Sequence, residues 1–135
     1  MLNYMSDSRK LFSSGAPWEN IVGYSRAVRV GNIIEISGTT ASDGDNIIGK
    51  GDVYAQTVFI LEKIRKVLEE AGSRMEDVVR TRMFVTNIAE WQNVAMAHSQ
   101  FFKDIKPAAT MVQVSRLINE ELLIEIEATA IICNK

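Results

Sequence analysis

Two carboxylates stand two residues apart near the C-terminal end of the chain, at Glu125 and Glu127. They fall in an alternating run, residues 122–132, and successive side chains of a β-strand point to opposite faces of a sheet. The two carboxylates would therefore share one face, about 7 Å apart. Such a pair either keeps an edge strand soluble or supplies acid–base groups to a pocket. The opposite face would hold Leu122, Ile124, Ile126, Ala128, Ala130 and Ile132.

Few other residues are candidates for chemistry. The one histidine, His98, falls on the apolar side of a predicted helix, which favours a hydrogen-bonded core or interface histidine over a catalytic base. The one cysteine, Cys133, follows two isoleucines and is interpreted as a bystander thiol rather than a nucleophile. A single cysteine allows neither an internal disulfide nor a multi-cysteine metal site. The chain has no HExxH, CxxC or GxGxxG motif, so we expect no metal and no cofactor.

Apolar periodicity predicts the strands that would surround these carboxylates. Gly31 and Asn32 join two β-branched runs, and such a pair is typical of a two-residue hairpin turn. In residues 78–86, one face would be apolar while Arg80, Arg82 and Phe84 would share the other. The apolar face of that strand would hold Val79, Thr81, Met83 and Val85. The predicted strands are residues 24–30, 33–37, 46–48, 78–86, 110–116 and 122–132.

Two helices are predicted between these strands. The first follows Asp52 as N-cap and ends near Ala71, before Gly72. Its buried stripe would be Tyr54, Val58, Leu61, Ile64, Leu68 and Ala71. The second starts at Asn87, with Glu90 placed for a capping box, and stops before Pro107. Its shared face would hold Ile88, Trp91, Val94, His98 and Phe101.

This order of elements predicts a single α/β domain over residues 1–135, with both helices packed on one face of a sheet. Residues 1–20 have few periodic cues, so we expect a loosely structured arm anchored by Trp18. The open sheet face would mix charge and apolar surface, which predicts an oligomer interface with polar pockets. That mixed face would carry Arg80, Arg82, Phe84, Met111 and Glu125.

Composition argues against several classes of function. The chain has 135 residues, is 47% hydrophobic and carries a net charge of −2, so no basic surface favours nucleic-acid binding. No apolar run approaches the roughly 18 residues that a membrane-spanning helix needs. The N-terminal segment lacks the apolar core of a signal peptide, and one cysteine fits a reducing compartment. We therefore expect a cytoplasmic protein that binds neither nucleic acid nor membrane.

Three segments resemble the RidA/YjgF family, also called the liver perchloric-acid-soluble protein or L-PSP endoribonuclease family. The segments are VGYSRAVRVGNIIEISGTT (22–40), KVLEEAGSRMEDVVRTRMFVTN (66–87) and KPAATMVQVSRL…LIEIEATA (106–130). The resemblance covers roughly residues 20–132. It implies a chorismate-mutase-like α/β fold and a homotrimer whose sheets face inward. It also implies pockets for a small metabolite between the subunits.

The resemblance also implies a reaction and a set of site residues. Active deaminases of the family hydrolyse imine and enamine products of amino-acid dehydratases to a 2-oxo acid and ammonia. By resemblance, Glu125 positions or activates the attacking water, and Tyr24 and the pair Ser37-Gly38 complete the pocket. The family's substrate-carboxylate arginine falls at Ala109, followed by Thr110, and Met111 stands where many members have cysteine.

The alanine at position 109 places the chain with arginine-lacking members of the family. Removing one partner of a buried charged pair costs about 3–5 kcal/mol, which argues against the standard 2-imino acid deaminase activity. The alternatives for a replacement are Arg26, Arg80, Arg82 and Arg116. Three functions remain open: a hydrolase acting through Glu125, a metabolite-binding trimer without turnover, and an endoribonuclease. The acidic balance argues against the last, and the first is favoured.

Overall fold

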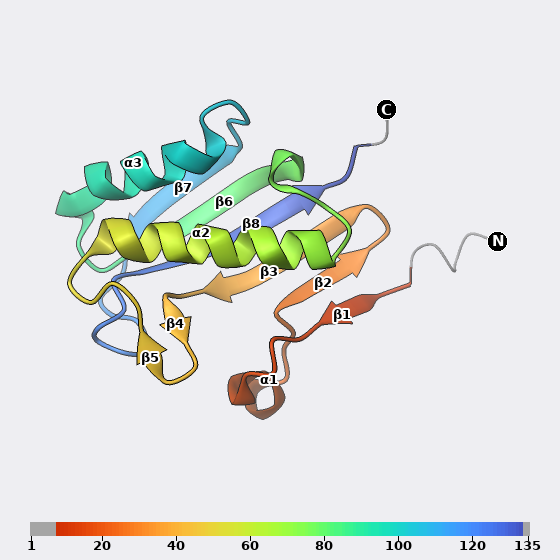
Figure 1. Ribbon diagram of the computed structural model, residues 1–135, viewed down its shortest axis with the longest axis horizontal. Helices are drawn as coiled ribbons and strands as arrows, with labels where there is room; N and C mark the ends of the chain where they lie inside the picture. Colours follow the sequence, from red (N-terminus) through yellow and green to blue (C-terminus); the bar gives the residue numbers. More distant parts are fainter. Residues whose placement is uncertain (1–7, 134–135) are drawn as a thin grey trace.

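One six-stranded mixed sheet carries the fold, with strand order β1-β2-β3-β8-β6-β7, and two helices cover one of its faces (Figure 1). The computed structural model describes residues 8–133. Only β6 and β7 pair in parallel; the other neighbours in this sheet are antiparallel. The strands are β1 Lys10–Phe12, β2 Ala27–Val30, β3 Ile33–Thr39, β6 Val78–Val85, β7 Ala108–Gln113 and β8 Ile124–Ile131. This architecture confirms the predicted α/β fold.

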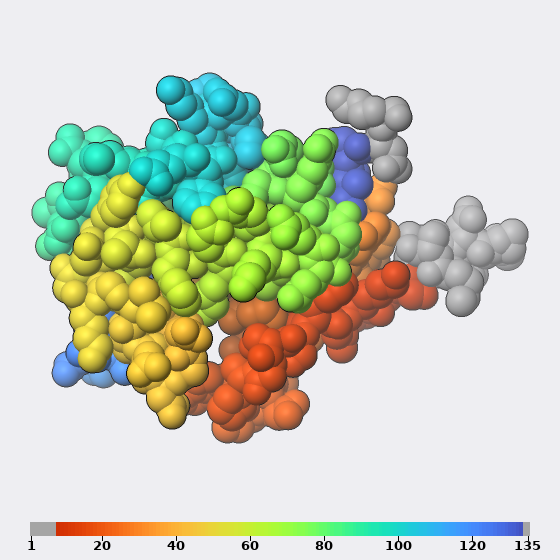
Figure 2. Space-filling view, in the orientation of Figure 1, coloured from red at the N-terminus to blue at the C-terminus, as the bar shows by residue number. Residues whose placement is uncertain are grey.

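Shorter elements and the helices connect these strands. The helices are α1 Pro17–Val22, α2 Val53–Glu70 and α3 Trp91–Phe102, with single 3₁₀ turns η2 Met75–Asp77 and η3 Ile88–Glu90. A separate small hairpin pairs β4 Ser42–Asp43 with β5 Asn46–Ile47. In Figure 2, α2 and α3 pack side by side and form a continuous layer over the sheet. The opposite sheet face has no such cover from the described residues, so it is available for a site or an interface.

Helix α2 forms as its sequence predicts. The side chain of Asp52 accepts a hydrogen bond from Ala55 N at 3.0 Å, which satisfies one free amide of the first turn. Gly72 follows the helix with a positive φ of 85°, a conformation that glycine adopts without steric cost. The predicted stripe is correct at Leu61, Ile64, Leu68 and Ala71, which are buried. It is wrong in the first turns, where Tyr54 and Val58 are only partly buried and Val53, Gln56 and Thr57 are buried instead.

Helix α3 differs from the expectation in its first turn. The segment opens as the 3₁₀ turn η3, in which the Asn87 side chain accepts from Ala89 N at 3.1 Å. A 3₁₀ turn has three residues instead of 3.6, which changes the direction of the first side chains. Ile88 and Trp91 are therefore exposed, and the predicted face is wrong at these two positions. The buried stripe of α3 is Val94, Ala97 and Phe102.

Strand β8 has the predicted alternation. Ile124, Ile126, Ala128 and Ala130 face the helices and are buried, while Glu125, Glu127, Thr129 and the exposed Ile131 lie on the open face. Strand β6 contains an irregularity that the alternation did not predict: Val78 pairs with Ala130, and Arg80 already pairs with Thr129. Val79 is thus the extra residue of a bulge and is 41% exposed. The expectation that Val79 shares the face of Thr81, Met83 and Val85 is wrong for this reason.

The N-terminal arm is more ordered than its sequence indicates. Residues 10–12 form β1 against β2, and residues 17–22 form α1, so the expected loose arm is corrected over these residues. Residues 1–7 lie outside the described residues. Trp18 is 52% exposed and is not the anchor. The anchor is Glu19, which is 5% exposed and accepts hydrogen bonds from Ser13 and Ser14. Because this anchor is polar, it does not contribute to a repeat of apolar residues, and the sequence pattern did not predict it.

Candidate functional site

Glu125 lies at the centre of the open sheet face, in β8 between β3 and β6. Strand β3 has a bulge between Ile36 and Thr39, and this irregularity brings Gly38 against the Glu125 side chain. A Cβ atom built on Gly38 would lie 2.0 Å from Glu125 Oε2. Only glycine leaves room for the carboxylate in this position, so the local fold of β3 shapes the site.

Arg26 joins this pair from the start of β2. Its Nη2 donates a hydrogen bond to the carbonyl oxygen of Gly38 at 2.5 Å. Its guanidinium carbon lies 5.7 Å from the centre of the Tyr24 ring, within the range of a cation–π contact. Ser37 Oγ donates to the carbonyl of Ser25 at 2.7 Å, which ties the bulge to the same segment. Tyr24, Arg26, Ser37, Gly38 and Glu125 are called the Glu125 cluster below.

The electrostatic state of Glu125 is set mainly by burial. Burial raises the pKa of this carboxyl group, the positive charge of Arg26 lowers it, and the negative charge of Glu127 raises it again. The net direction is upward. Within residues 8–133 the carboxylate has no hydrogen bond or ion pair within contact distance. A carboxyl group with a raised pKa and free oxygens is suited to accept and return a proton.

Glu127 has a different environment, although it shares the face. Its Oε1 lies 3.6 Å from Arg82 Nη1 on the neighbouring strand, and the two side chains are 39% and 41% exposed. An exposed pair of this kind contributes about 0–1 kcal/mol. The sequence left open whether the two carboxylates are solvated or belong to a pocket. Glu127 is a solvated partner of Arg82 on the neighbouring strand, whereas Glu125 lies within the Glu125 cluster.

The remaining predicted site residues lie on β7, at the edge of the sheet. Ala109 pairs with Thr81, and Met111 pairs with Met83, both of which face the helices. The expectation that Met111 shares the open face with Glu125 is therefore wrong, because alternation along β7 starts on the other side. Since β6 separates β7 from β8, one chain does not bring Ala109 or Met111 to Glu125.

Thr110 is the predicted β7 residue that does point to the open face. Its Oγ1 accepts a hydrogen bond from Arg80 Nη2 at 2.7 Å. Arg80 is thereby engaged at the sheet edge, just as Arg82 is engaged with Glu127. Of the four arginines considered as replacements at position 109, Arg26 is the one that the structure places beside Glu125. Tyr24 and Arg26 both precede β2, and their spacing of two within the predicted strand 24–30 was the available sequence signal.

A cavity of about 370 Å³ lies between α3 and the β7 edge, and Met111 lines it together with Met83 and Phe102. His98 also lines this cavity, and its Nε2 is hydrogen-bonded to Thr81 Oγ1 at 3.0 Å. Burial lowers the pKa of His98, so the ring is neutral near pH 7. The predicted hydrogen bond of His98 is confirmed, and the ring is partly buried at the cavity wall and lies outside the core.

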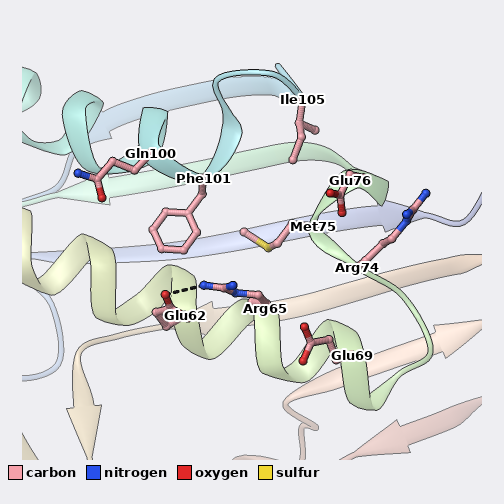
Figure 3. A pocket seen from close by; sticks show the side chains of 9 residues that line it. All are labelled: Glu62, Arg65, Glu69, Arg74, Met75, Glu76, Gln100, Phe101 and Ile105. Carbon is pink, nitrogen blue, oxygen red and sulfur yellow. Dashed lines mark hydrogen bonds and ion pairs between the residues drawn. The ribbon is translucent and has the colours of Figure 1, made fainter.

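A second cavity, of about 530 Å³, opens between the outer surfaces of α2 and α3 (Figure 3). Figure 3 shows Glu62 and Arg65 joined in an ion pair on α2, with Phe101 of α3 beside them. The Arg65 guanidinium lies 5.6 Å from the centre of the Phe101 ring. This cavity is on the helix side, away from the open face that carries Glu125, and its central arginine is already paired.

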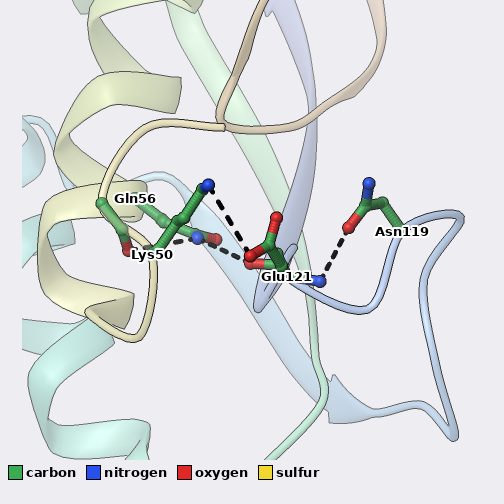
Figure 4. Close-up of polar contacts among 5 residues, drawn as sticks. Lys50, Gln56, Asn119 and Glu121 are labelled. Carbon is green, nitrogen blue, oxygen red and sulfur yellow. Dashed lines mark hydrogen bonds and ion pairs between the residues drawn. The ribbon is translucent and has the colours of Figure 1, made fainter. Parts of the chain in front are cut away.

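Gln56 positions the strand that carries Glu125, and sequence reasoning missed it. This buried side chain donates to the carbonyls of Gly49 and Glu121, at 3.2 and 2.9 Å, and accepts from Leu123 N at 2.8 Å. Figure 4 shows the contact between Gln56 and Glu121 together with the Lys50–Glu121 ion pair, whose distance is 3.8 Å. The contacts attach the start of β8 to α2. A polar residue on a helix's buried stripe was the signal that could have indicated this role.

Metal-binding groups and membrane-spanning helices were both searched for among the described residues. Among residues 8–133, no group of three or more His, Cys, Asp or Glu side chains is arranged to hold a metal ion. The same part of the chain has no helix that is long and apolar enough to cross a membrane.

Comparisons with known proteins agree with this fold. The sequence profile of the family described as Endoribonuclease L-PSP matches residues 15–132. A RutC family protein of Pyrococcus abyssi, PYRAB12510, is 37% identical over 121 residues, covering 89% of this chain and 94% of the relative. The crystal structure of Rv2704 from Mycobacterium tuberculosis, described as a member of the YjgF/YER057c/UK114 family, is 45% identical with a TM-score of 0.85. That alignment covers 93% of this chain and all of the other.

Proposed function

Because this chain belongs to the endoribonuclease L-PSP family, which includes the RidA and YjgF proteins, we propose that it hydrolyses a small imine or enamine at the Glu125 cluster. The observation that carries this proposal is the Glu125 carboxyl group, which is half-buried over Gly38, has a raised pKa and has no hydrogen-bond partner among residues 8–133. Carboxyl groups in such surroundings are typical of acid–base sites.

In the proposed reaction, water adds to the carbon of a C=N bond. Glu125 accepts a proton from the attacking water as the C–O bond forms, and the imine nitrogen gains a proton. The resulting carbinolamine then loses ammonia as its C–N bond breaks and its hydroxyl proton leaves. The balance is one imine and one water consumed, with one carbonyl compound and one ammonia released. An enamine enters the same route after protonation at carbon. The raised pKa keeps the protonated and ionised forms of Glu125 closer in free energy near neutral pH.

A homotrimer would complete the pocket. The Glu125 cluster lies on an open sheet face, whereas Ala109 and Met111 lie at the β7 edge on the other side of the sheet. A neighbouring subunit that placed its β7 edge over the cluster would bring both sets together around a small metabolite. Val112, which is 42% exposed on β7, and the exposed Ile118 supply apolar surface for this contact.

Two alternatives make different predictions. A metabolite-binding trimer without turnover is favoured by Ala109, because the family's usual anchor for a substrate carboxylate is absent. RNA cleavage rests on the family description alone, and the net charge of −2 gives no electrostatic attraction to phosphates.

The deciding experiment supplies 2-aminoacrylate and 2-iminobutyrate, generated by a dehydratase, to the purified protein. The release of 2-oxo acid is then compared with buffer and with a Glu125→Gln variant. Acceleration by the wild-type protein that the variant lacks supports the proposal. Saturable binding of the 2-oxo acid without acceleration selects the binding trimer. Cleavage of single-stranded RNA by the wild-type protein, with neither of the other results, selects the endoribonuclease.

A further inference from the structure

The cavity between α2 and α3 has the size and the floor of a small-ligand site. Its volume is about 530 Å³, and clefts of roughly 300–1,000 Å³ are typical of such sites. Met75, Phe101 and Ile105 line it, and all three belong to the hydrophobic core or pack against it. The proposed trimer would cover the open sheet face, so this cavity on the helix side would stay accessible to solvent.

Arg65 supplies hydrogen-bond donors that a ligand can reach. Its Nη2 is bonded to Glu62 Oε2 at 2.5 Å, and its guanidinium carbon lies 5.6 Å from the centre of the Phe101 ring. These two contacts hold the guanidinium at the cavity wall. An arginine has five N–H donors, and Arg65 uses one hydrogen bond among residues 8–133. The side chain is 41% exposed, so the remaining donors are accessible.

Glu69 supplies an acceptor one helical turn after Arg65. Side chains four residues apart are neighbours on a helix surface, with about 5–6 Å between their Cβ atoms. Both side chains line the cavity, and Figure 3 shows them on successive turns of α2, with Met75 and Phe101 across from them. Among residues 8–133 Glu69 forms no ion pair. The helix therefore presents a donor and an acceptor side by side.

The charges around the apolar floor restrict the class of ligand. With Glu62, Arg74 and Glu76, three carboxylates and two guanidinium groups line the cavity, a balance that does not favour a phosphate or another bare anion. A purely apolar ligand would remove water from Arg65 and Glu69 without replacing the lost hydrogen bonds. A ligand that combines a carboxylate, an ammonium group and an apolar side chain compensates each part of the lining.

We propose that the cavity between α2 and α3 binds a free α-amino acid with an apolar side chain, at a site that is separate from the open sheet face and independent of the proposed hydrolysis. The carboxylate binds the N–H groups of Arg65, and the ammonium group binds Glu69. The side chain lies on Met75, Phe101 and Ile105. One carbon separates the two charged groups of an α-amino acid, which suits two side chains on consecutive turns of one helix face.

The test titrates the full chain with L-leucine by calorimetry. Three analogues each lack one feature: L-leucine methyl ester lacks the carboxylate, 4-methylpentanoate lacks the ammonium group, and glycine lacks the apolar side chain. We expect saturable binding of L-leucine below about 10 mM, and a loss of about tenfold in affinity for each analogue. No saturable binding of L-leucine overturns the inference. Equal affinity for L-leucine and the three analogues indicates non-specific adsorption and also overturns it.

Variants of α2 locate the binding. Arg65→Gln and Glu69→Gln should each weaken L-leucine binding about tenfold, because each removes one charged partner. The matched control is Lys66→Gln, since Lys66 is exposed on the same helix and does not line the cavity. Glu125→Gln is the control for the open sheet face. Both controls should bind L-leucine with wild-type affinity.

A measurement on the wild type checks the site without any variant. L-leucine should shift the NMR resonances of the Met75 methyl group and the Phe101 ring. Shifts confined to residues around Gly38, or binding lost in Glu125→Gln, would place the amino acid on the open sheet face and overturn the inference. Affinity within threefold of wild type in Arg65→Gln or in Glu69→Gln would overturn it as well. L-leucine binding in a protein that hydrolyses no imine sustains the inference and refutes only the proposed function.

Discussion

The Oε2 atom of Glu125 occupies the space where a side chain on residue 38 would begin. A Cβ on Gly38 would lie 2.0 Å from this oxygen, well inside any tolerated contact. The Glu125 side chain of β8 therefore fits against the bulge of β3 because residue 38 is glycine. This relationship makes several consequences of the proposed function measurable.

Replacing Gly38 with alanine should displace the Glu125 side chain. We expect Gly38→Ala to lower hydrolysis at least tenfold while the protein remains folded, because the flexible carboxylate can move but then leaves its position beside Arg26. The check is a double-mutant cycle in the free energy of unfolding. Gly38→Ala should cost about 1–3 kcal/mol in the wild type and distinctly less in a Glu125→Ala background. Equal costs in both backgrounds would mean that the two residues do not interact.

Replacing Glu125 with glutamine should remove turnover and retain the fold. Glutamine preserves the shape of the side chain but cannot accept the proton of the attacking water, so we expect a loss of about 10²–10⁴-fold in the rate of 2-oxo acid release. The matched control is Glu127→Gln, two residues away on the same face, whose partner is the exposed Arg82. That variant should hydrolyse at the wild-type rate. Similar losses in both variants would indicate a general charge effect instead of a role for Glu125.

The raised pKa of Glu125 makes a prediction about stability and pH. Above the ordinary value of 4.5 and up to the raised pKa, the folded state binds more protons at this group than the unfolded state. The free energy of unfolding of the wild type, relative to Glu125→Gln, should therefore fall as pH rises through this window and level off above it. Urea unfolding of both proteins over a pH series, at one protein concentration, measures the difference. A difference that rises with pH would show that Arg26 outweighs burial.

The proposed trimer can be tested at the β7 edge. Sedimentation equilibrium of the wild type should give three times the mass of the chain. Val112→Lys adds a charge at an exposed position of β7, so the subunit should fold normally but assemble poorly and lose turnover. Lys66→Glu, which changes the charge on the helix side of the subunit, serves as the control and should leave the mass unchanged. A wild-type monomer that still hydrolyses imines would refute the intersubunit pocket.

Local patterns in the chain were sufficient for much of this architecture. Alternation along β8 places Glu125 opposite the core, and the spacing and cap of α2 predict that helix nearly to its ends. The Gly31-Asn32 turn and the pairing of Val30 with Ile33 could also be predicted from the sequence. These features depend on the geometry of a single strand, helix or turn, which neighbouring residues determine.

The errors arose where irregular geometry interrupts a pattern. The bulge at Val79 exposes a residue that strict alternation buries, and the 3₁₀ turn before α3 exposes Trp91. The β7 strand starts at Ala108 in a phase that turns Met111 toward the helices. Each of these irregularities changes which face the following side chains point to. The alternation or helical spacing of apolar residues before and after it looks the same in the sequence.

The predicted membership of Glu125, Ser37, Gly38 and Tyr24 in one site came from the order of residues along the chain and from a family resemblance. The distances between these residues could not be predicted in this way. Nor could the sequence show which of the four candidate arginines lies beside Glu125; in the structure it is Arg26. Those depend on β3 pairing with β8 across a bulge, and on β6 separating β7 from both. Strand order and register minimise the free energy of the whole sheet, so the contact between Gly38 and Glu125, far apart in the sequence, follows from the folded chain and from no local pattern.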